Sequence, residues 1–219
     1  MSQYDKFADE YAQKTVALEK KMRQGFYSFL PSLDHKSVLD VGCGCGHDAA
    51  FYVKAGAAVS GIDISKKQIA MAQSAVKGNF AIGSMEKLPY AAHSFDVVTS
   101  VYALQASTTP SVVLKEMIRV VKPQGIVQVL TKHPIRNLLE RSVNNGVHDY
   151  YAKGNVTSFI FGGSLELSEP GHTLMDYLTP SVLKRARLLR FEEDSDFHAC
   201  AQLMGLKYPT QMIMQFQKI

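Results

Sequence analysis

The segment LDVGCGCGHD at residues 39–48 constrains the fold of this chain more than any other, because three glycines alternate there with other residues. A short apolar run, SVLDV at 37–41, precedes it, and a helical pattern, HDAAFYVKAG at 47–56, follows it. Glycine adopts backbone dihedral angles that other residues avoid, and it lets a ligand approach the main chain closely. This order of strand, glycine loop and helix predicts a ligand-binding turn at the end of a buried strand.

The alternation of strands and helices continues along the chain. We expect further strands at residues 57–64, 79–84, 94–101 and 126–131, and a closing strand at 210–219. One helix begins at Ser65, where S-K-K-Q forms a capping box. Another begins at Thr109–Pro110 and ends before Pro123, because the residue preceding proline avoids the helical region. Strands separated by helices at this rhythm predict a parallel sheet with helices on both faces.

Four further segments carry predictions of their own. Residues 4–30 are predicted to be helical, with Pro31 as a stop. Residues 133–178 contain four turn signals with aromatic residues between them, namely Tyr150, Tyr151, Phe159 and Phe161. They form either a structured connection or a lid over the site, and their length favours the lid. The turn KPQG is predicted to be of type I, which tolerates Gln124. The basic stretch LKRARLLR at 183–190 is predicted to be a solvated helix face.

Composition excludes several classes of protein. The chain has 219 residues and a net charge of +4, which is too small to argue for nucleic acid. No apolar run approaches the roughly 20 residues of a membrane helix, and the N-terminal segment is charged rather than apolar, so we expect a cytoplasmic protein. Cys43, Cys45 and His47 lack the Cys-x(2–4)-Cys spacing of structural zinc, so we expect no metal site.

An acidic residue lies 21 residues after Gly42, near the end of the second predicted strand. This residue, Asp63, is positioned to accept hydrogen bonds from both hydroxyls of a ribose. The dinucleotide fingerprint G-x-G-x-x-G would place its last glycine at position 47, which is His47. The pattern D-x-G-x-G-x-G at 40–46 instead suits a nucleoside without a pyrophosphate. It disfavours an NAD-dependent oxidoreductase, which stays the weakest alternative.

An ordered set of motifs resembles the class I S-adenosylmethionine-dependent methyltransferases, most closely the branch of ubiquinone, menaquinone and small-molecule enzymes. The motifs are YDKFADEYA, VLDVGCGCG, GIDIS, GSMEKLPY, SFDVVTSVYAL and LKEMIRVVKPQG, and they cover most of residues 4–131. The resemblance implies a Rossmann-like, doubly wound α/β fold with a mostly parallel seven-stranded sheet and an antiparallel C-terminal strand. It also implies S-adenosyl-L-methionine as cofactor. Residues 1–219 would form a single domain with a helical cap at 1–31 and a substrate-side insertion at 133–178, after strand five.

The resemblance implies a set of cofactor-binding residues: Asp40, Gly42, Cys43, Gly44, Asp63, Ile64, Ser84, Met85 and Ser100. The glycine loop and Ser100 would line the methionine part, and Asp40 would lie near its amino group. Asp63 would hold the ribose, while Ile64, Ser84 and Met85 would surround the adenine. Ser84 stands where the family usually has an aspartate, and a hydroxyl bonds the adenine amino group more weakly than an ionised carboxylate does. Tyr4 and Tyr11 would either close over the cofactor or pack within the helix.

Methyl transfer from a sulfonium needs an aligned acceptor and the exclusion of water. Orientation can supply about 7–11 kcal/mol of the barrier, and a general base is needed only for an acceptor that is protonated at the working pH. His172, His133 and Tyr102 are the catalytic candidates, with Gln105 and Tyr150 also on the acceptor side. His172 ranks first because DYYAKGN…GHTLMDYL resembles a stretch that carries an active-site histidine in small-molecule members.

The motifs also limit the substrate. Signatures of nucleic-acid, protein-arginine and metal-dependent catechol methyltransferases are absent after the fourth predicted strand. We therefore expect a small organic substrate with an apolar or aromatic part, no nucleic-acid partner and no membrane insertion. A non-catalytic sensor or scaffold that binds S-adenosylmethionine is the main alternative. The oligomeric state is left open, with a homodimer among the options.

Overall fold

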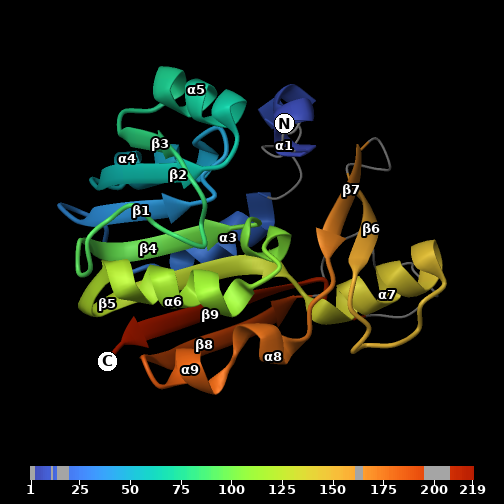
Figure 1. Cartoon of the computed structure of the whole chain (residues 1–219). Helices are drawn as coiled ribbons and strands as arrows, with labels where there is room; N and C mark the ends of the chain where they lie inside the picture. The colour runs from blue at the N-terminus through green and yellow to red at the C-terminus, as the bar shows by residue number, and fades with distance from the viewer. Residues whose placement is uncertain (1–2, 11, 14–19, 161–164, 195–207) are drawn as a thin grey trace.

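A seven-stranded sheet forms the centre of the computed structural model, which describes residues 3–10, 12–13, 20–160, 165–194 and 208–219. Its strand order is β3-β2-β1-β4-β5-β9-β8 (Figure 1). The strands are β1 Ser37–Val41, β2 Ala58–Asp63, β3 Asn79–Ile82, β4 Phe95–Val101, β5 Val121–Lys132, β8 Ala186–Asp194 and β9 Gln211–Lys218. Strands β1 to β5 pair in parallel, and β9 runs antiparallel to both β5 and β8. The predicted mostly parallel sheet with an antiparallel C-terminal strand is confirmed.

Helices cover both faces of the sheet. They are α1 Gln3–Lys6, α3 Lys20–Ser28, α4 His47–Lys54, α5 Lys66–Ala75, the 3₁₀ turn η1 Leu104–Ala106, α6 Pro110–Val120, α7 Pro134–Asn145, α8 Leu174–Tyr177 and α9 Pro180–Leu183. In Figure 1, α6, α8 and α9 lie in front of the sheet, and α3 and α4 lie behind it. None of the described helices has the length and apolarity that crossing a membrane requires.

The central strands are apolar on both sides because each face of the sheet is covered. Leu39 and Val41 of β1 pack into the core beneath α6, whereas Val38 packs into the core beneath α4. Successive side chains of a strand point to opposite faces, so one short apolar run contributes to both cores. Because β1 pairs in parallel with both β2 and β4, the carboxyl ends of the three strands lie at one edge of the sheet.

The insertion after β5 is built from α7, a hairpin and α8. Strands β6 Asn155–Ile160 and β7 Leu165–Pro170 pair antiparallel as a separate two-stranded sheet. Figure 1 shows α7 and the hairpin beside the edge at which β1 and β2 end. The ammonium of Lys132 at the end of β5 is buried 2.8 Å from the Glu169 carboxylate of β7 and donates to Ser158 of β6 at 2.6 Å. The insertion is therefore anchored to the sheet by a buried ion pair.

The basic stretch LKRARLLR is not a helix face. Helix α9 ends at Leu183, and β8 begins at Ala186 and pairs with β9. Because β8 is the last strand of the sheet, its outer side has no neighbouring strand among the described residues. Charged side chains are common on such edges, where they discourage pairing with another chain. Arg187 and Arg190 are therefore charged residues of an edge strand, not of a helix.

One further local prediction, the type I turn at KPQG, is wrong. Gln124 has a φ of 61°, a left-handed conformation that the third residue of a type I turn does not adopt. The N-terminal segment is helical at 3–6, 8–10, 12–13 and 20–28, as predicted, except for a turn at Phe7 after α1. Tyr11 and Phe161 lie outside the described residues.

Candidate functional site

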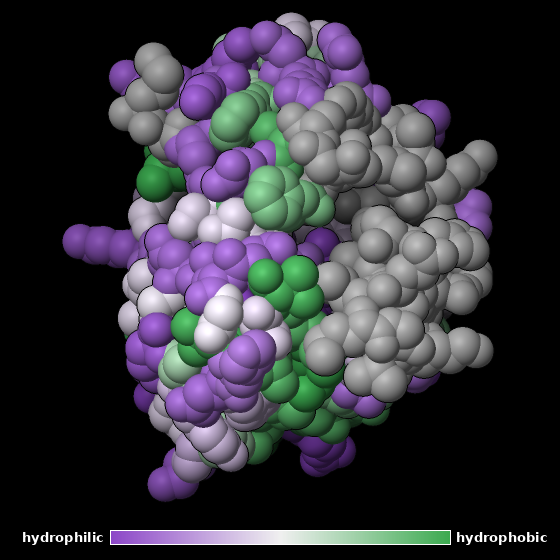
Figure 2. Space-filling view, turned by 90° about the vertical axis from the view of Figure 1, so that its right-hand side faces the viewer, coloured by the Kyte–Doolittle hydropathy of each residue, from purple (hydrophilic) through white to green (hydrophobic). Residues whose placement is uncertain are grey.

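A cavity of about 320 Å³ opens at the carboxyl ends of β1, β2 and β4. Figure 2 views the molecule from this edge, where apolar side chains lie between polar surfaces. The described residues that line the cavity are Gln3, Tyr4, Ala12, Arg23, Gly42, Cys43, Gly44, Cys45, His47, Asp48, Ile62, Asp63, Ile64, Gln68, Gly83, Ser84, Met85, Glu86, Val101, Tyr102, Ala103 and Ala106. The cavity occupies the position at which open α/β sheets bind ligands.

The glycine loop forms one wall of this cavity. Gly42 has a φ of 73°, and a Cβ atom added to it would lie only 2.2 Å from the Cβ of Ala103. The main chains after β1 and β4 approach each other this closely because position 42 has no side chain. Cys43 is buried, and Gly44 has a φ of 52°. The structure thus places all three predicted loop residues on the cavity wall.

Asp63 links the glycine loop to the start of α5. Its Oδ2 accepts the Gly44 N–H at 2.9 Å, and its Oδ1 accepts the Ser65 N–H at 2.8 Å. Burial raises the pKa of the Asp63 carboxyl, and these backbone hydrogen bonds oppose the rise. Each carboxylate oxygen has two lone pairs, so each can still accept a hydrogen bond from a ligand hydroxyl.

The capping box at Ser65 is only half formed. The Ser65 hydroxyl accepts the Gln68 N–H at 3.2 Å, as predicted. The Ser65 N–H is bound by Asp63 rather than by the Gln68 side chain. The Gln68 Oε1 is buried and has no hydrogen-bond partner among the described residues.

Arg23 and Asp48, which both line the cavity, form a buried ion pair. The Arg23 Nε lies 2.8 Å from Asp48 Oδ1, and its Nη2 lies 3.2 Å from Asp48 Oδ2. The Tyr27 hydroxyl donates to Asp48 at 2.6 Å. Sequence reasoning missed Arg23, because a single arginine in a helical pattern carries no signal that it meets a residue 25 positions away.

Asp40 lies behind the cavity wall. Its carboxyl is 1% exposed, and its Oδ1 accepts the Thr99 hydroxyl at 3.3 Å. Its Oδ2 has no hydrogen-bond partner among the described residues. Burial, reinforced by the charge of Asp48, raises the pKa of Asp40 well above its usual range. Ser100 is likewise fully buried and does not line the cavity.

The raised pKa of Asp40 predicts that Asp40→Asn stabilises the protein. A folded state that binds a proton more tightly than the unfolded chain loses stability as pH rises above the unfolded pKa of about 4. Asparagine removes this loss and keeps the acceptor for Thr99. We expect a gain of about 1 kcal/mol in the free energy of unfolding at pH 8 and a smaller gain at pH 5. Urea denaturation at both pH values checks this, and an equal or opposite effect would contradict it.

The third group of side chains lies after β2 and β3. Ile64 follows β2 and is 57% exposed, and Met85 follows the parallel strand β3; both line the cavity. The Ser84 hydroxyl donates to the carboxylate of Glu86, which also accepts the Ser107 hydroxyl at 2.8 Å. Glu86 was not among the predicted site residues. It follows the predicted strand without a distinctive pattern.

Of the three catalytic candidates, Tyr102 lines the cavity. It has a φ of 51°, its hydroxyl donates to the Gln211 side chain, and the Arg23 guanidinium lies 5.9 Å from its ring centre. His47, which was not a catalytic candidate, also lines the cavity, and burial lowers its pKa.

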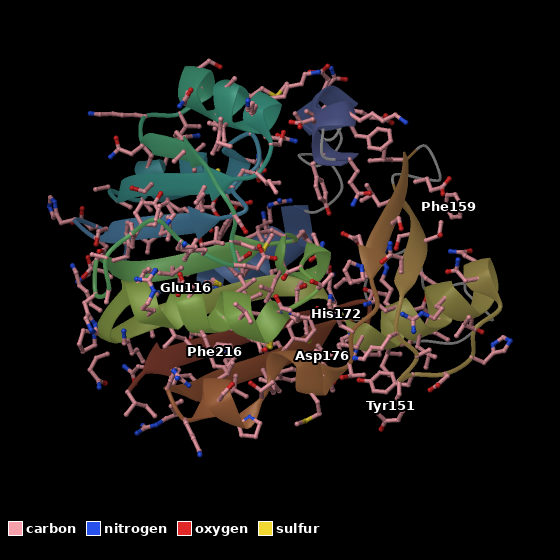
Figure 3. The ribbon with its side chains drawn as sticks, in the orientation of Figure 1. Glu116, Tyr151, Phe159, His172, Asp176 and Phe216 are labelled. Atoms are coloured by element: carbon pink, nitrogen blue, oxygen red, sulfur yellow. The ribbon has the colours of Figure 1, made fainter. Side chains whose placement is uncertain are left out.

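The other two candidate histidines do not line the cavity. His172 is buried, with its Nε2 3.1 Å from the Gln105 carbonyl oxygen and its ring edge against Tyr177. Figure 3 shows it close to Asp176, where the hairpin leads into α8. Burial lowers the pKa of His172. His133 caps α7, because its Nδ1 accepts the Ile135 N–H at 3.0 Å.

The remaining acceptor-side candidates also lie away from the cavity. The Gln105 side chain is buried between the Tyr102 carbonyl and the Thr131 hydroxyl. The Tyr150 hydroxyl accepts the Leu174 N–H at 2.9 Å. Tyr151 and Phe159 are exposed and point away from the sheet in Figure 3. Their orientation does not support the predicted role of the insertion's aromatic residues around the substrate.

The sheet order, the glycine loop and an acid at the end of β2 define a Rossmann-like nucleoside-binding domain of the methyltransferase type. Residues 39–129 match the methyltransferase domain family. This match makes residues 39–129 similar to the class I S-adenosylmethionine-dependent methyltransferases, as the motifs predict, and S-adenosyl-L-methionine is the cofactor that this family implies.

Individual relatives agree with this assignment. The chain is 28% identical over 129 residues to a malonyl-[acyl-carrier protein] O-methyltransferase of Pectobacterium atrosepticum, covering 58% of this chain and 48% of that protein. It is 25% identical over 194 residues to a demethylmenaquinone methyltransferase of Thermotoga maritima, covering 84% and 83%. An S-adenosylmethionine-dependent methyltransferase structure from Mesorhizobium loti has the same fold, with a TM-score of 0.73, 19% identity and coverage of 89% and 96%. The chain spans about half the length of several curated relatives that it matches.

Proposed function

We propose that this protein transfers a methyl group from S-adenosylmethionine to a small organic molecule. The observation that carries the proposal is the Asp63 carboxylate, which faces the cavity beside the glycine loop and retains acceptor capacity on both oxygens. The two ends of the cavity match the two ends of the cofactor. Apolar Ile64 and Met85 suit the adenosine end, and the charged Arg23–Asp48 pair suits the amino-acid end.

The residues present therefore fit the cofactor. Asp63 would accept the ribose hydroxyls, and Ile64 and Met85 would pack against the base. The bare main chain at Gly42 and Gly44 would let the methionine part approach. The guanidinium of Arg23, which is 6% exposed on the cavity wall, would attract the α-carboxylate of the cofactor.

Arg23→Met is expected to weaken binding of S-adenosylhomocysteine by about tenfold, because a charge-assisted hydrogen bond to the carboxylate is lost while the apolar stem is kept. Binding of 5′-methylthioadenosine, which has no carboxylate, should change by less than about twofold. Calorimetric titration of both ligands measures this. Equal weakening for the two would show that Arg23 acts only through the fold.

The main task of the protein in this reaction would be to position the cofactor and the acceptor relative to each other. The bound cofactor supplies a methyl group that its sulfonium already activates. The crevice would hold it while Tyr102, from the loop after β4, orients the acceptor beside it. His47 lines the same cavity with a pKa lowered by burial, so its neutral ring can take a proton from an acceptor that must lose one. His172 would act by positioning the Gln105 carbonyl behind the wall.

The substrate class rests on the relatives. Their names refer to quinone precursors and to a malonyl group carried by a protein. These names support an acceptor with a small reacting group, and the family match does not favour the oxidoreductase alternative. The motifs that are missing after β4 also disfavour nucleic acid.

The proposal is tested with two measurements on the whole chain. S-adenosylhomocysteine should bind in calorimetry, and transfer of an isotope-labelled methyl group should be detected on at least one member of a panel of hydroquinones, phenols, carboxylic acids and amines. Absence of binding would overturn the proposal. Tight binding without transfer to any member would instead support the non-catalytic sensor.

A further inference from the structure

Strand β8 is the longer of the two edge strands of the central sheet. It has nine residues, whereas β3 at the opposite edge has four. Figure 1 shows β8 at the lower end of the sheet, and none of the described strands pairs with its outer side. An edge strand exposes a row of N–H and C=O groups to which a further strand can bind. The outer side of β8 is long enough to accept one.

The central charged residues of β8 share one face of the sheet. Residues that lie opposite each other in an antiparallel pair point to the same side, and alternate residues of one strand also share a side. Arg190 lies opposite Gln215 of β9. Glu192 lies opposite Ile213, two residues away on the same strand. The Gln215 amide donates to the Phe29 carbonyl, and the Arg190 guanidinium lies 4.0 Å from the centre of the Phe29 ring. Because Phe29 follows α3, both charges lie on the α3 side.

The signs of the charges follow the direction of the strand. The sequence ARLLRFEED has its basic residues in the first part and its acidic residues at the end. The side chains of Arg190 and Glu192 pair with each other at 2.9 Å, and they remain 40% and 48% exposed. An edge with charges of one sign repels a second copy of itself. An edge with a basic start and an acidic end instead matches the same strand running in the opposite direction.

We infer that β8 pairs with β8 of a second copy of this chain, in antiparallel orientation about a two-fold axis at Phe191. This register places Arg190 opposite the partner subunit's Glu192, and Glu192 opposite the partner subunit's Arg190. Each of the four charges would then have an opposite charge beside it along the strand and another across the junction. A two-fold axis repeats every contact, so the edge is complementary to itself. The two central sheets would join into one.

The other face of β8 fits the same register. Leu188 and Phe191 pack against the core beneath α6, and Phe191 would meet its own copy at the two-fold axis. Leu189, at which the pairing with β9 is irregular, is 46% exposed. Pairing would remove more of this apolar surface from water, which favours association. The interface would therefore combine apolar contacts on one face with ion pairs on the other.

Sedimentation velocity of the full chain over a range of concentrations tests the pairing. We expect the unaltered protein to form a dimer that dissociates on dilution. Glu192→Arg puts two arginines opposite two arginines, so the dissociation constant of the dimer should rise at least about tenfold. Arg190→Glu puts glutamates opposite glutamates and should have the same effect. An unaltered protein that stays monomeric up to about 100 μM would overturn the inference.

A mixture of the two charge variants gives the sharpest result. In a mixed pair the two glutamates of one chain lie opposite the two arginines of the other, so a heterodimer should form although each variant alone dimerises weakly. Glu166→Arg reverses an exposed charge on β7 and is the matched control, which should dimerise like the unaltered protein. The inference is wrong if either charge variant dimerises as tightly as the unaltered protein, or if the mixture forms no heterodimer. Circular dichroism checks that each variant is folded.

Hydrogen exchange supplies a second measurement that needs no variant. The outward amides of β8 should exchange more slowly at high protein concentration than at low concentration, because the second strand protects them. The amides of β3, the other edge strand, should exchange at the same rate at both concentrations. If the protein dimerises and exchange in β8 does not change, the dimer uses another surface and the inference is overturned.

Discussion

Replacing Asp63 with alanine is expected to weaken binding of S-adenosylhomocysteine by about 100-fold, or about 2.7 kcal/mol. The change removes the acceptor for the ribose hydroxyls, and hydrogen bonds to a charged group contribute about 1.5–3 kcal/mol. It also leaves the Gly44 N–H and the Ser65 N–H without their carboxylate partner. The glycine loop then loses the contact that holds it against the end of β2. Calorimetric titration measures the loss directly.

The ribose role can be separated from the loop role with a second ligand. The 2′-deoxy analogue of S-adenosylhomocysteine lacks one hydroxyl, so it should bind the unaltered protein more weakly than the parent compound. In Asp63→Ala the two ligands should bind almost equally, because the partner of that hydroxyl is gone. The exposed Asp34 supplies a matched control, since Asp34→Ala should leave both affinities unchanged. A persistent preference for the 2′-hydroxyl in Asp63→Ala would refute the assignment.

The parts of the site that the sequence predicts well are those that depend on backbone order. Asp63 ends β2, the loop residues Gly42 and Gly44 and the residues Ile64 and Met85 come after strands, and all of them lie on the cavity wall. Parallel strands bring their carboxyl ends to one edge, so a residue just after a strand is placed by topology alone. This reasoning needs no knowledge of side-chain direction.

Some predicted site residues do not line the cavity because their side chains point away from it. Asp40 is inside β1 and faces Thr99 of the neighbouring strand, so it lies behind the cavity wall. His133 follows β5, but its ring turns back to cap the helix that begins beside it. His172 follows the hairpin and is buried against Tyr177. None of these directions can be derived from spacing in the sequence.

Contacts between distant segments were the other source of error. The pairing of Arg23 with Asp48 joins an N-terminal helix to the first residues of α4. The hydrogen bond from Ser107 to Glu86 joins two loops. The strand β8 is recognisable only once β9 is present beside it, because its charged edge resembles a solvated helix in isolation. Each of these features arises from packing, which local propensity does not encode.

Replacing Gly42 with alanine is expected to lower the free energy of unfolding by about 3 kcal/mol, because two separate penalties add. The φ of 73° places an alanine in the left-handed region, at a cost of about 1–2 kcal/mol. The added methyl group would also lie 2.2 Å from the Cβ of Ala103, and such overpacking costs about 1–3 kcal/mol. Urea denaturation, with the native fold checked by circular dichroism, measures the sum.

A double-mutant cycle separates the two penalties and shows why the loop requires this glycine. Ala103→Gly removes the atom that clashes, so the double variant Gly42→Ala/Ala103→Gly should recover at least about 1 kcal/mol beyond the sum of the single changes. Gly44→Ala is the matched control: its φ is 52°, but the nearest atom to an added Cβ is 3.7 Å away. It should therefore show the strain alone, and Ala103→Gly should not rescue it. If the changes in the free energy of unfolding of Gly42→Ala and Ala103→Gly simply add, the loop moves aside and the two residues do not interact. The close approach of the two main chains would then not be needed to shape the cofactor cavity.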